Sequence, residues 1–244
     1  MTVAGSDSGG GAGIQADLKA FAALGVFGTS AITCITAQNP GEVRGILGVR
    51  PGMVALQIET VCRAFQVKAA KTGMLYSAAI IKSVSAALAK ERIGHIVVDP
   101  VMVATSGARL LRPDAQAALR ERILPMAEVI TPNMPEAEAL CAHPVRTLPD
   151  MEKAAREIGL RYRASCVVKG GHLEGKEAID VLFHEGKICH LRSGRLKVLA
   201  HGTGCSFSAA LAAELAKGLS VPAAAERAKR FVHGMLKFLL IGTA

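Results

Sequence analysis

The sequence predicts an α/β domain in which helices cover both faces of a central, mostly parallel sheet. Short apolar runs alternate with longer segments of helical spacing, the pattern of parallel strands joined by crossover helices. Aromatic residues are only 4% of the 244 residues, so the core must rely on small aliphatic side chains that let helices lie close on a sheet. No linker or internal repeat interrupts the pattern, and we expect a single domain over residues 1–244.

The first half of the chain alternates expected strands and helices. After a first strand that ends at "GSDSGGGAG", the apolar run 26–37 predicts a buried strand, and further strands are expected at 67–75 and 94–102. A helix is expected at 77–90, and another at 52–65, where helical spacing places on one face Val54, Ile58, Val61 and Phe65.

The second half continues the alternation. Strands are expected at 127–133 and 164–171, and a hairpin with "HEGK" as its turn is expected at 178–191. Helical patterns cover 113–124, 150–161, 204–218 and 221–240.

Polar or glycine-rich segments follow most of the predicted strands. They are "GSDSGGGAG", "TAQN", "KTGM", "DPVMVATSG", "TPNMPE" and "KGGH". Ligands of open α/β sheets bind beyond the carboxyl ends of the strands. Each segment alone is compatible with an ordinary loop, but six at one sheet edge predict a ligand site there.

The net charge of +9 allows two interpretations. An excess of positive charge favours an anionic partner such as a nucleotide or a phosphate ester, and it is equally compatible with a solvated basic surface. The basic residues are scattered and no stripe of basic and aromatic residues is present, so we do not expect nucleic-acid binding.

The cysteines and the ends of the chain indicate a cytoplasmic protein. None of the six cysteines forms a CxxC pair, and the first residues lack the pattern of a secretory signal peptide, so we expect reduced thiols. The apolar end "MLKFLLIGTA" is too short to span a bilayer, and we expect no membrane partner.

Two common nucleotide motifs are not met. The segment "GSDSGGGAGI" has its glycines at the wrong offsets for the dinucleotide-binding fingerprint GxGxxG. The segment "GGHLEGKE" approaches the P-loop pattern, but Glu177 replaces the hydroxyl that binds Mg²⁺, so we interpret "EGK" as a turn.

The segment "AHGTGCSFSAALAAELAKG", residues 200–218, is more informative. Gly202 and Gly204 supply backbone freedom just before a helix that starts near Cys205. The free N–H groups of a helix start bind anions such as phosphate, and they lower the pKa of a thiol. We therefore expect a phosphoryl site with a thiolate at Cys205; the alternative is a glycine-capped helix start with a packed cysteine.

Charged residues near strand ends suggest the metal and phosphate contacts of an ATP-using enzyme. Asp99 and Glu136 follow predicted strands and are candidates to hold Mg²⁺ through water. Lys169 is a candidate phosphate contact as a point charge. The alternatives are loop capping or surface exposure for the two carboxylates, and a solvent-exposed strand end for the lysine.

Long motifs of the chain resemble a known enzyme family. "AGSDSGGGAGIQADLK", "TAQN", "KTGML", "VVDPVM", "TPNMPEAEAL", "KGGH" and "HGTGC" occur in the order found in the hydroxymethylpyrimidine and hydroxymethylpyrimidine-phosphate kinases of thiamine biosynthesis. The resemblance implies a ribokinase-like three-layer α/β/α fold. It implies ATP and Mg²⁺ as cofactors and two successive phosphoryl transfers, to 4-amino-5-hydroxymethyl-2-methylpyrimidine and then to its monophosphate.

The resemblance also implies roles for individual residues. The anion hole matches Gly202, Thr203 and Gly204, with Cys205 in the position of the catalytic base. The pyrimidine pocket matches Gly5, Asp17, Gln38 and Met74, and the amide of Gln38 can pair with an aminopyrimidine. The nucleotide side matches Asn133 and Lys169, and the metal side matches Asp99 and Glu136.

Two other functions and one assembly remain open. A pyridoxal kinase of the same superfamily is the alternative activity, since a thiol at Cys205 can add to an aldehyde. A degenerate kinase fold that senses pyrimidines is disfavoured, because the glycines, Cys205 and Asp99 are intact. The resemblance implies a homodimer, with the helices at 52–65 or 77–90 as candidates for its interface.

Overall fold

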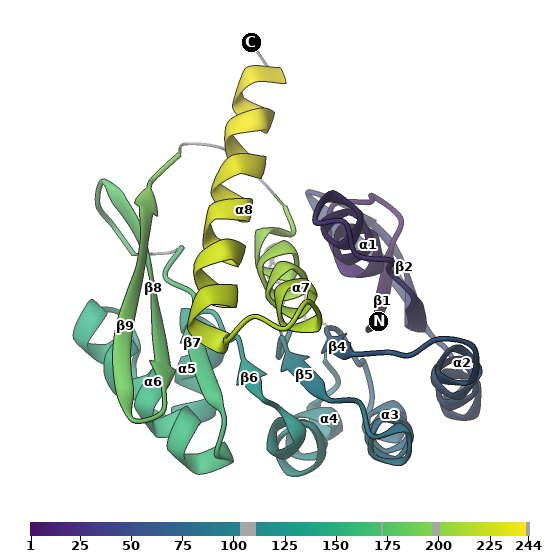
Figure 1. The fold of residues 1–244 in the computed structure, drawn as a ribbon. Helices are drawn as coiled ribbons and strands as arrows, with labels where there is room; N and C mark the ends of the chain where they lie inside the picture. Colours follow the sequence, from purple (N-terminus) through teal and green to yellow (C-terminus); the bar gives the residue numbers. More distant parts are fainter. Residues whose placement is uncertain (103–110, 172, 197–200, 243–244) are drawn as a thin grey trace.

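A computed structural model describes residues 1–102, 111–171, 173–196 and 201–242 (Figure 1). Its strands form one sheet in the order β3-β2-β1-β4-β5-β6-β7-β8-β9. The strands are β1 (Thr2–Asp7), β2 (Ser30–Asn39), β3 (Glu42–Gly48), β4 (Ala69–Thr72), β5 (His95–Val98), β6 (Val129–Ile130), β7 (Ser165–Val168), β8 (Glu177–His184) and β9 (Lys187–Gly194). The helices are α1 (Gly13–Ala23), α2 (Pro51–Ala64), α3 (Ala78–Glu91), α4 (Pro113–Ala118), α5 (Met134–Cys141), α6 (Leu148–Tyr162), α7 (Thr203–Ala216) and α8 (Val221–Gly242).

The centre of the sheet is parallel, as the sequence predicts. The strands β2, β1, β4, β5, β6 and β7 pair with one another in parallel. Antiparallel pairing is confined to the two margins, where β3 pairs with β2 and the β8–β9 hairpin continues from β7. All six parallel strands therefore end at the same edge of the sheet.

Helices cover both faces of this sheet (Figure 1). One core packs α2 to α6 against the sheet and contains large aliphatic side chains such as Ile58, Ile81 and Leu88. The other core contains α1, α7 and α8, and α7 contributes small buried residues, Ala209, Ala210, Ala212 and Ala213. Small side chains let α7 lie close over β4 and β5, so its start reaches the carboxyl edge of the sheet.

The predicted hairpin at 178–191 is confirmed, and its turn has a clear backbone reason. Glu185 and Gly186 both have positive φ, 47° and 79°, as the two-residue turns that match the twist of paired strands require. The predicted helix at 113–124 is shorter than expected: α4 ends at Ala118, a π-helical segment follows at Leu119–Ile123, and Leu124–Met126 is a 3₁₀ turn. Pro125 has no N–H to continue an α-helix.

Three elements were not predicted. The helix α1 follows a glycine-rich segment and was not expected. No residue of the strand β3 is buried and two of its seven residues are glycine, so it gives no strong strand pattern. The helix α5 has only eight residues, but its start carries a recognisable capping box between Asn133 and Glu136. Among the described residues, no helix has both the length and the apolar character needed to cross a membrane.

Candidate active site

A cavity of about 400 Å³ opens at the carboxyl edge of the parallel strands. Its walls come from the segments after β1, β2, β4, β5, β6 and β7 and from the start of α7. The structure brings to this cavity all the predicted site residues but Asp17: Gly5, Gln38, Met74, Asp99, Asn133, Glu136, Lys169, Gly202, Thr203, Gly204 and Cys205. The described parts of the six strand-end segments therefore line one cavity, as expected; residues 103–107 and 172 of these segments lie outside the described residues.

The start of α7 depends on a glycine at position 202. Gly202 caps the helix with φ of 80°, a left-handed conformation that glycine adopts without strain. A Cβ atom there would lie 1.8 Å from the carbonyl oxygen of Gly11, because the two glycine segments touch. No side chain caps this helix, so its first N–H groups are available to an anion in the cavity.

The thiol of Cys205 lies on the first turn of α7 and is half-buried. Burial raises its pKa to about 11, and the nearby Lys71 ammonium and the Gly13 N–H oppose that rise without cancelling it. The expectation of a lowered pKa is therefore wrong for the protein without ligands. Burial, helped by the Asp99 and Asp17 carboxylates, outweighs the Lys71 ammonium, so Cys205 is a neutral thiol at pH 7.

A buried ion pair supports the cavity floor. The Lys71 ammonium lies 3.0 Å from both carboxylate oxygens of Asp17, and the Thr2 hydroxyl donates to Asp17 at 2.6 Å. Both charged side chains are fully buried, and Lys71 lines the cavity whereas Asp17 does not. Burial opposes the charge of Lys71, but the Asp17 carboxylate outweighs it and raises the pKa of the ammonium. Asp17 therefore acts through Lys71 and lies behind the wall that was expected to contain it.

Two carboxylates and one ammonium form the opposite wall. The Lys169 ammonium donates to Asp99 at 2.8 Å, and a Cβ atom on Gly204 would lie 3.1 Å from the same nitrogen. Lys169 therefore lies directly beside the glycine turn. Burial opposes its charge, but Asp99 and Glu136 together raise its pKa.

Glu136 has a structural role as well as a place in the cavity. Its carboxylate accepts the backbone N–H groups of Asn133, at 2.9 Å, and Met102, at 3.2 Å, while the Asn133 side chain caps α5 in return. Burial raises the pKa of Glu136, and Lys169 opposes that rise. Asp99 and Glu136 are 2% and 5% exposed, and Lys169 is the one cation that pairs with this wall among the described residues. This donor set suits a hydrated Mg²⁺ ion.

The residues expected to form the pyrimidine pocket combine an apolar wall with an amide that already has partners. Gly5 approaches Cys34 so closely that a Cβ atom would lie 2.7 Å from its sulfur, and Met74 completes this apolar wall. The amide of Gln38 is already engaged, since its oxygen accepts from Thr36 at 3.2 Å and its nitrogen lies 3.0 Å from His201 Nε2.

Sequence reasoning missed several cavity residues. His201 stands just before "GTGC", and Lys71 is a lone cation within a run of small buried residues, which is a usable signal for a buried ion pair. The cavity also extends between the β8–β9 hairpin and α8, where Asp180 pairs with Lys229 at 2.8 Å and accepts the Gly170 N–H. Nothing in the sequences of the β8–β9 hairpin and of α8 distinguishes these cavity residues from residues with a purely structural role.

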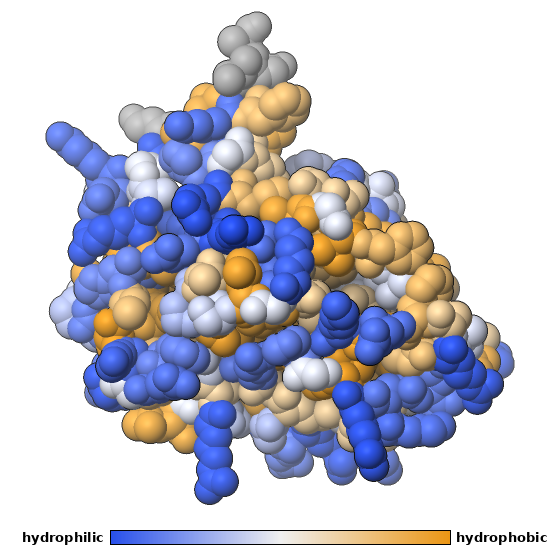
Figure 2. Space-filling model, in the orientation of Figure 1, coloured by the Kyte–Doolittle hydropathy of each residue, from blue (hydrophilic) through white to orange (hydrophobic). Residues whose placement is uncertain are grey.

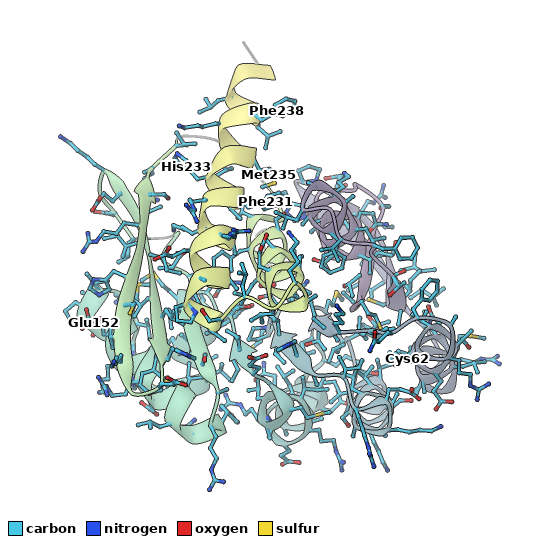
Figure 3. The ribbon with its side chains drawn as sticks, in the orientation of Figure 1. Cys62, Glu152, Phe231, His233, Met235 and Phe238 are labelled. Carbon is cyan, nitrogen blue, oxygen red and sulfur yellow. The ribbon has the colours of Figure 1, made fainter. Side chains whose placement is uncertain are left out.

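The helix α8 forms one side of that extension and then projects beyond the fold (Figure 1). His233 points toward the β8–β9 side, whereas Met235 and Phe238 lie on the side toward α1 (Figure 3). Phe238 is 76% exposed, and hydrophobic residues gather on this projecting end (Figure 2). The middle of α8 lines the cavity, through Lys229, Val232, His233 and Leu236.

The fold and the site together define a ribokinase-like kinase. The structure is similar to a phosphomethylpyrimidine kinase from Clostridium difficile 630, with a TM-score of 0.85 and 38% identity, covering 96% of this chain and 97% of that one. It is also similar to an ADP complex of Bacillus subtilis pyridoxal kinase, with a TM-score of 0.87 and 39% identity over 94% and 88% of the two chains. These similarities confirm the predicted ribokinase-like fold.

The chain belongs to the phosphomethylpyrimidine kinase family, whose profile matches residues 7–241. It is 46% identical to the hydroxymethylpyrimidine/phosphomethylpyrimidine kinase of Rhizobium meliloti over 97% of this chain and 89% of that protein. It is 44% identical to a thiamine biosynthesis bifunctional protein of Geobacter sulfurreducens. The match covers 97% of this chain but 49% of the bifunctional protein, so the chain spans about half the length of such relatives.

Proposed function

We propose that the chain transfers the γ-phosphoryl group of ATP to 4-amino-5-hydroxymethyl-2-methylpyrimidine and then to the resulting monophosphate. It is a phosphotransferase by family, and its relatives carry the name of both activities. The observation that carries the proposal is the start of α7, where a glycine turn, a thiol and the Lys169 ammonium meet in one cavity. Phosphoryl transfer depends on positioning and charge stabilisation, which this arrangement supplies.

Each wall has a proposed task. The N–H groups at the start of α7 and the Lys169 ammonium hold the transferred phosphoryl group. Asp99 and Glu136 hold a hydrated Mg²⁺ ion, which neutralises phosphate charge when bound. Gln38 orients the aminopyrimidine, and this requires the Gln38 amide to exchange its contact with His201 for the ring. Gly5 and Met74 pack against the pyrimidine, and Asn133 holds the loop on the nucleotide side.

The neutral thiol suits an enzyme with two acceptors. In the first transfer a loose transition state keeps the hydroxyl proton on the acceptor oxygen until late, so a strong base is not needed. The neutral Cys205 thiol would accept a hydrogen bond from that hydroxyl, and the proton would leave to an oxygen of the transferred phosphoryl group. In the second transfer the acceptor is an anionic phosphate oxygen, which has no need of a strong base. A permanent carboxylate at position 205 would repel that second acceptor.

Cys205→Asp should therefore slow the second transfer more than the first, by about tenfold or more if repulsion contributes about 1.4 kcal/mol. The measurement is kcat/KM for each acceptor separately, with Cys205→Ser as the matched uncharged control. Equal losses in both transfers for Cys205→Asp would contradict the idea that charge at this position separates the two acceptors.

Gly202→Ala should lower kcat/KM by about 100-fold, because the added Cβ atom forces the two glycine segments apart and misplaces the anion site. Gly218→Ala is the matched control. Gly218 also has a positive φ, 90°, but a Cβ atom there meets nothing within 4 Å. Both variants carry backbone strain, so a comparable activity loss in Gly218→Ala would show that strain alone explains the result.

The test of function is a mass spectrum of the products from hydroxymethylpyrimidine, Mg-ATP and the protein, sampled over time. We expect the monophosphate first and the diphosphate later. Monophosphate that never proceeds to diphosphate would remove the second activity, and no product at all with either acceptor would overturn the proposal.

Pyridoxal is the second candidate substrate, because the B. subtilis neighbour of this fold is a pyridoxal kinase. The Cys205 thiol can add across an aldehyde carbonyl, with sulfur bonding to carbon and the thiol proton moving to oxygen, to give a hemithioacetal. Adding pyridoxal to the same assay tests this candidate. A kcat/KM for pyridoxal above that for hydroxymethylpyrimidine would make it the main substrate.

We further propose that the whole chain is one domain, that it forms a homodimer, and that it resides in the cytoplasm. Exposed apolar side chains on neighbouring elements support a dimer through β2, β3 and α2: Ile35, Leu47, Met53 and Leu56. The alternative helix α3 is less suitable, because most of its apolar face is buried within the chain. Six free thiols fit a reducing compartment. Sedimentation equilibrium should give twice 25.4 kDa.

A further inference from the structure

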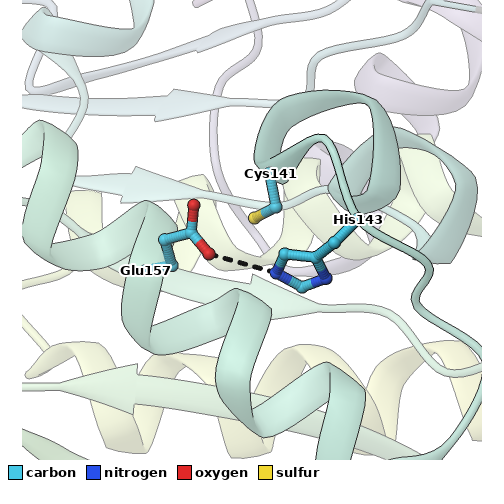
Figure 4. Close-up of side chains that lie close together, drawn as sticks. All are labelled: Cys141, His143 and Glu157. Carbon is cyan, nitrogen blue, oxygen red and sulfur yellow. Dashed lines mark hydrogen bonds and ion pairs between the residues drawn. The ribbon is translucent and has the colours of Figure 1, made fainter.

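A cluster of three side chains lies where α5 meets α6, outside the cavity described above. Cys141 is the last residue of α5, His143 follows two positions later, and Glu157 projects from α6 (Figure 4). Their ligand atoms, a sulfur, a ring nitrogen and a carboxylate oxygen, all lie within 4.8 Å of one another. The proposed function uses none of the three.

The histidine is oriented like a metal ligand. His143 Nδ1 lies 3.1 Å from the carbonyl oxygen of Pro144, and its Nε2 lies 3.1 Å from a Glu157 oxygen. Both oxygens accept, so a neutral ring can donate to only one of them. In the tautomer that donates Nδ1–H to Pro144, the Nε2 lone pair faces Glu157, and a metal ion between the two would take both as ligands. A histidine bound to metal commonly donates its other N–H to such a carbonyl.

Neighbouring contacts hold the three ligands in place. Ala142 adopts φ of 60° and turns the chain back at the end of α5, which brings His143 toward α6. Arg161 donates to the second Glu157 oxygen at 2.7 Å and, through its other nitrogen, to the Leu140 carbonyl oxygen at 2.7 Å. The Cys141 thiol faces α6 and donates to the Ala154 carbonyl oxygen at 3.9 Å, a hydrogen bond that the thiolate gives up when it binds metal. The contacts of Arg161 orient Glu157 before the ion arrives.

We propose that Cys141, His143 and Glu157 bind a Zn²⁺ ion, with water as the fourth ligand. One thiolate, one imidazole and one carboxylate are ligands that zinc accepts in tetrahedral geometry, whereas Mg²⁺ and Ca²⁺ select oxygen sets. The two negative ligands balance the charge of the ion. Arg161 then neutralises the outer carboxylate oxygen, which the metal leaves free.

The ion would join the end of α5 to α6. The start of α5 carries Glu136 and is capped by Asn133, and both line the cavity. A metal at the other end of this eight-residue helix therefore steadies the element that positions those two residues. The proposed effect of the ion is on the fold, and its occupancy can be measured without any enzyme assay.

The test is a titration of the full chain, freed of metal by a chelator and kept reduced, with Co²⁺ as a spectroscopic substitute for Zn²⁺. We expect one equivalent of Co²⁺ to produce a near-ultraviolet band from thiolate-to-cobalt charge transfer and intense visible bands of tetrahedral cobalt. One equivalent of Zn²⁺ should abolish both. Oxygen-only binding at Asp99 and Glu136 gives no thiolate band, so the readout separates the two sites.

Variants assign the band to this cluster. Cys141→Ser should lose it, and His143→Gln, at a half-buried position, should weaken Zn²⁺ binding by more than about 100-fold. Cys205→Ser and Cys189→Ser, which leave the cluster intact, should bind as the unaltered protein does. Zn²⁺ should raise the melting temperature of the unaltered protein and leave that of His143→Gln unchanged. No saturable thiolate band, or a band that persists in Cys141→Ser, would overturn the proposal.

Discussion

Asp17→Asn should lower the free energy of unfolding by about 3–5 kcal/mol, because it leaves the Lys71 ammonium buried without its counter-charge. The pair is fully buried, with both N–O distances at 3.0 Å, so solvent cannot replace the lost carboxylate. Urea denaturation measures the effect as a shift of midpoint at unchanged slope. Glu177→Gln is the matched control, since its ion pair with Arg192 is about half exposed and removing it should change stability by less than about 1 kcal/mol.

A double variant distinguishes the effect of an unpaired buried charge from the effect of losing the ion pair as a whole. Asp17→Leu with Lys71→Met replaces both ions by apolar side chains, and such replacements are often neutral or stabilising by about 1–4 kcal/mol. We expect it to be more stable than Asp17→Asn and inactive, because Lys71 lines the cavity beside Cys205. A double variant as unstable as Asp17→Asn would mean that packing, and not charge, makes this position sensitive.

The architecture was predictable from sequence because parallel sheets leave a strong local pattern. Apolar runs with polar ends recur before "TAQN", "KTGM" and "TPNMPE", and each run became a parallel strand. The cavity followed from topology, since parallel strands must end at one edge. The margins of the sheet were harder to predict. The strand β3 is half-exposed and gives no periodicity. The role of α8 in the cavity depends on packing that no local sequence pattern encodes.

Individual contacts were less predictable than the site. Lys71 and Asp17 are 54 positions apart, so their pairing depends on the register of β1 and β4 with α1. The pKa of Cys205 was predicted in the wrong direction because sequence shows a helix start but not the burial and the nearby carboxylates that raise the pKa. The structure places the residues identified by motif in the cavity, with the exception of Asp17. The partners of buried charges, in contrast, could be identified only from the structure.

Lys169→Met should lower kcat by about 10²–10³, the loss expected when one group that stabilises transition-state charge is removed. Its ammonium pairs with Asp99 and lies next to Gly204, so it is placed to contact a phosphoryl group held there. Lys169→Arg keeps the charge with a different shape and should recover part of the rate. Lys90→Met is the surface control, because that side chain is 62% exposed and far from the cavity lining.

The interpretation of Lys169→Met requires that loss of fold and loss of catalysis be distinguished. Removing the ammonium leaves Asp99, which is 3% exposed, without its partner, and this alone destabilises the protein. Lys169→Met combined with Asp99→Asn removes the unpaired charge, so stability should recover. Because Asp99 is also a proposed Mg²⁺ ligand, the reference for kcat is Asp99→Asn alone, and the double variant should be slower than that reference by about 10²–10³. If the kcat of the double variant equalled that of Asp99→Asn, Lys169 would serve only to neutralise Asp99, and the phosphoryl group would be held by the start of α7 without a lysine.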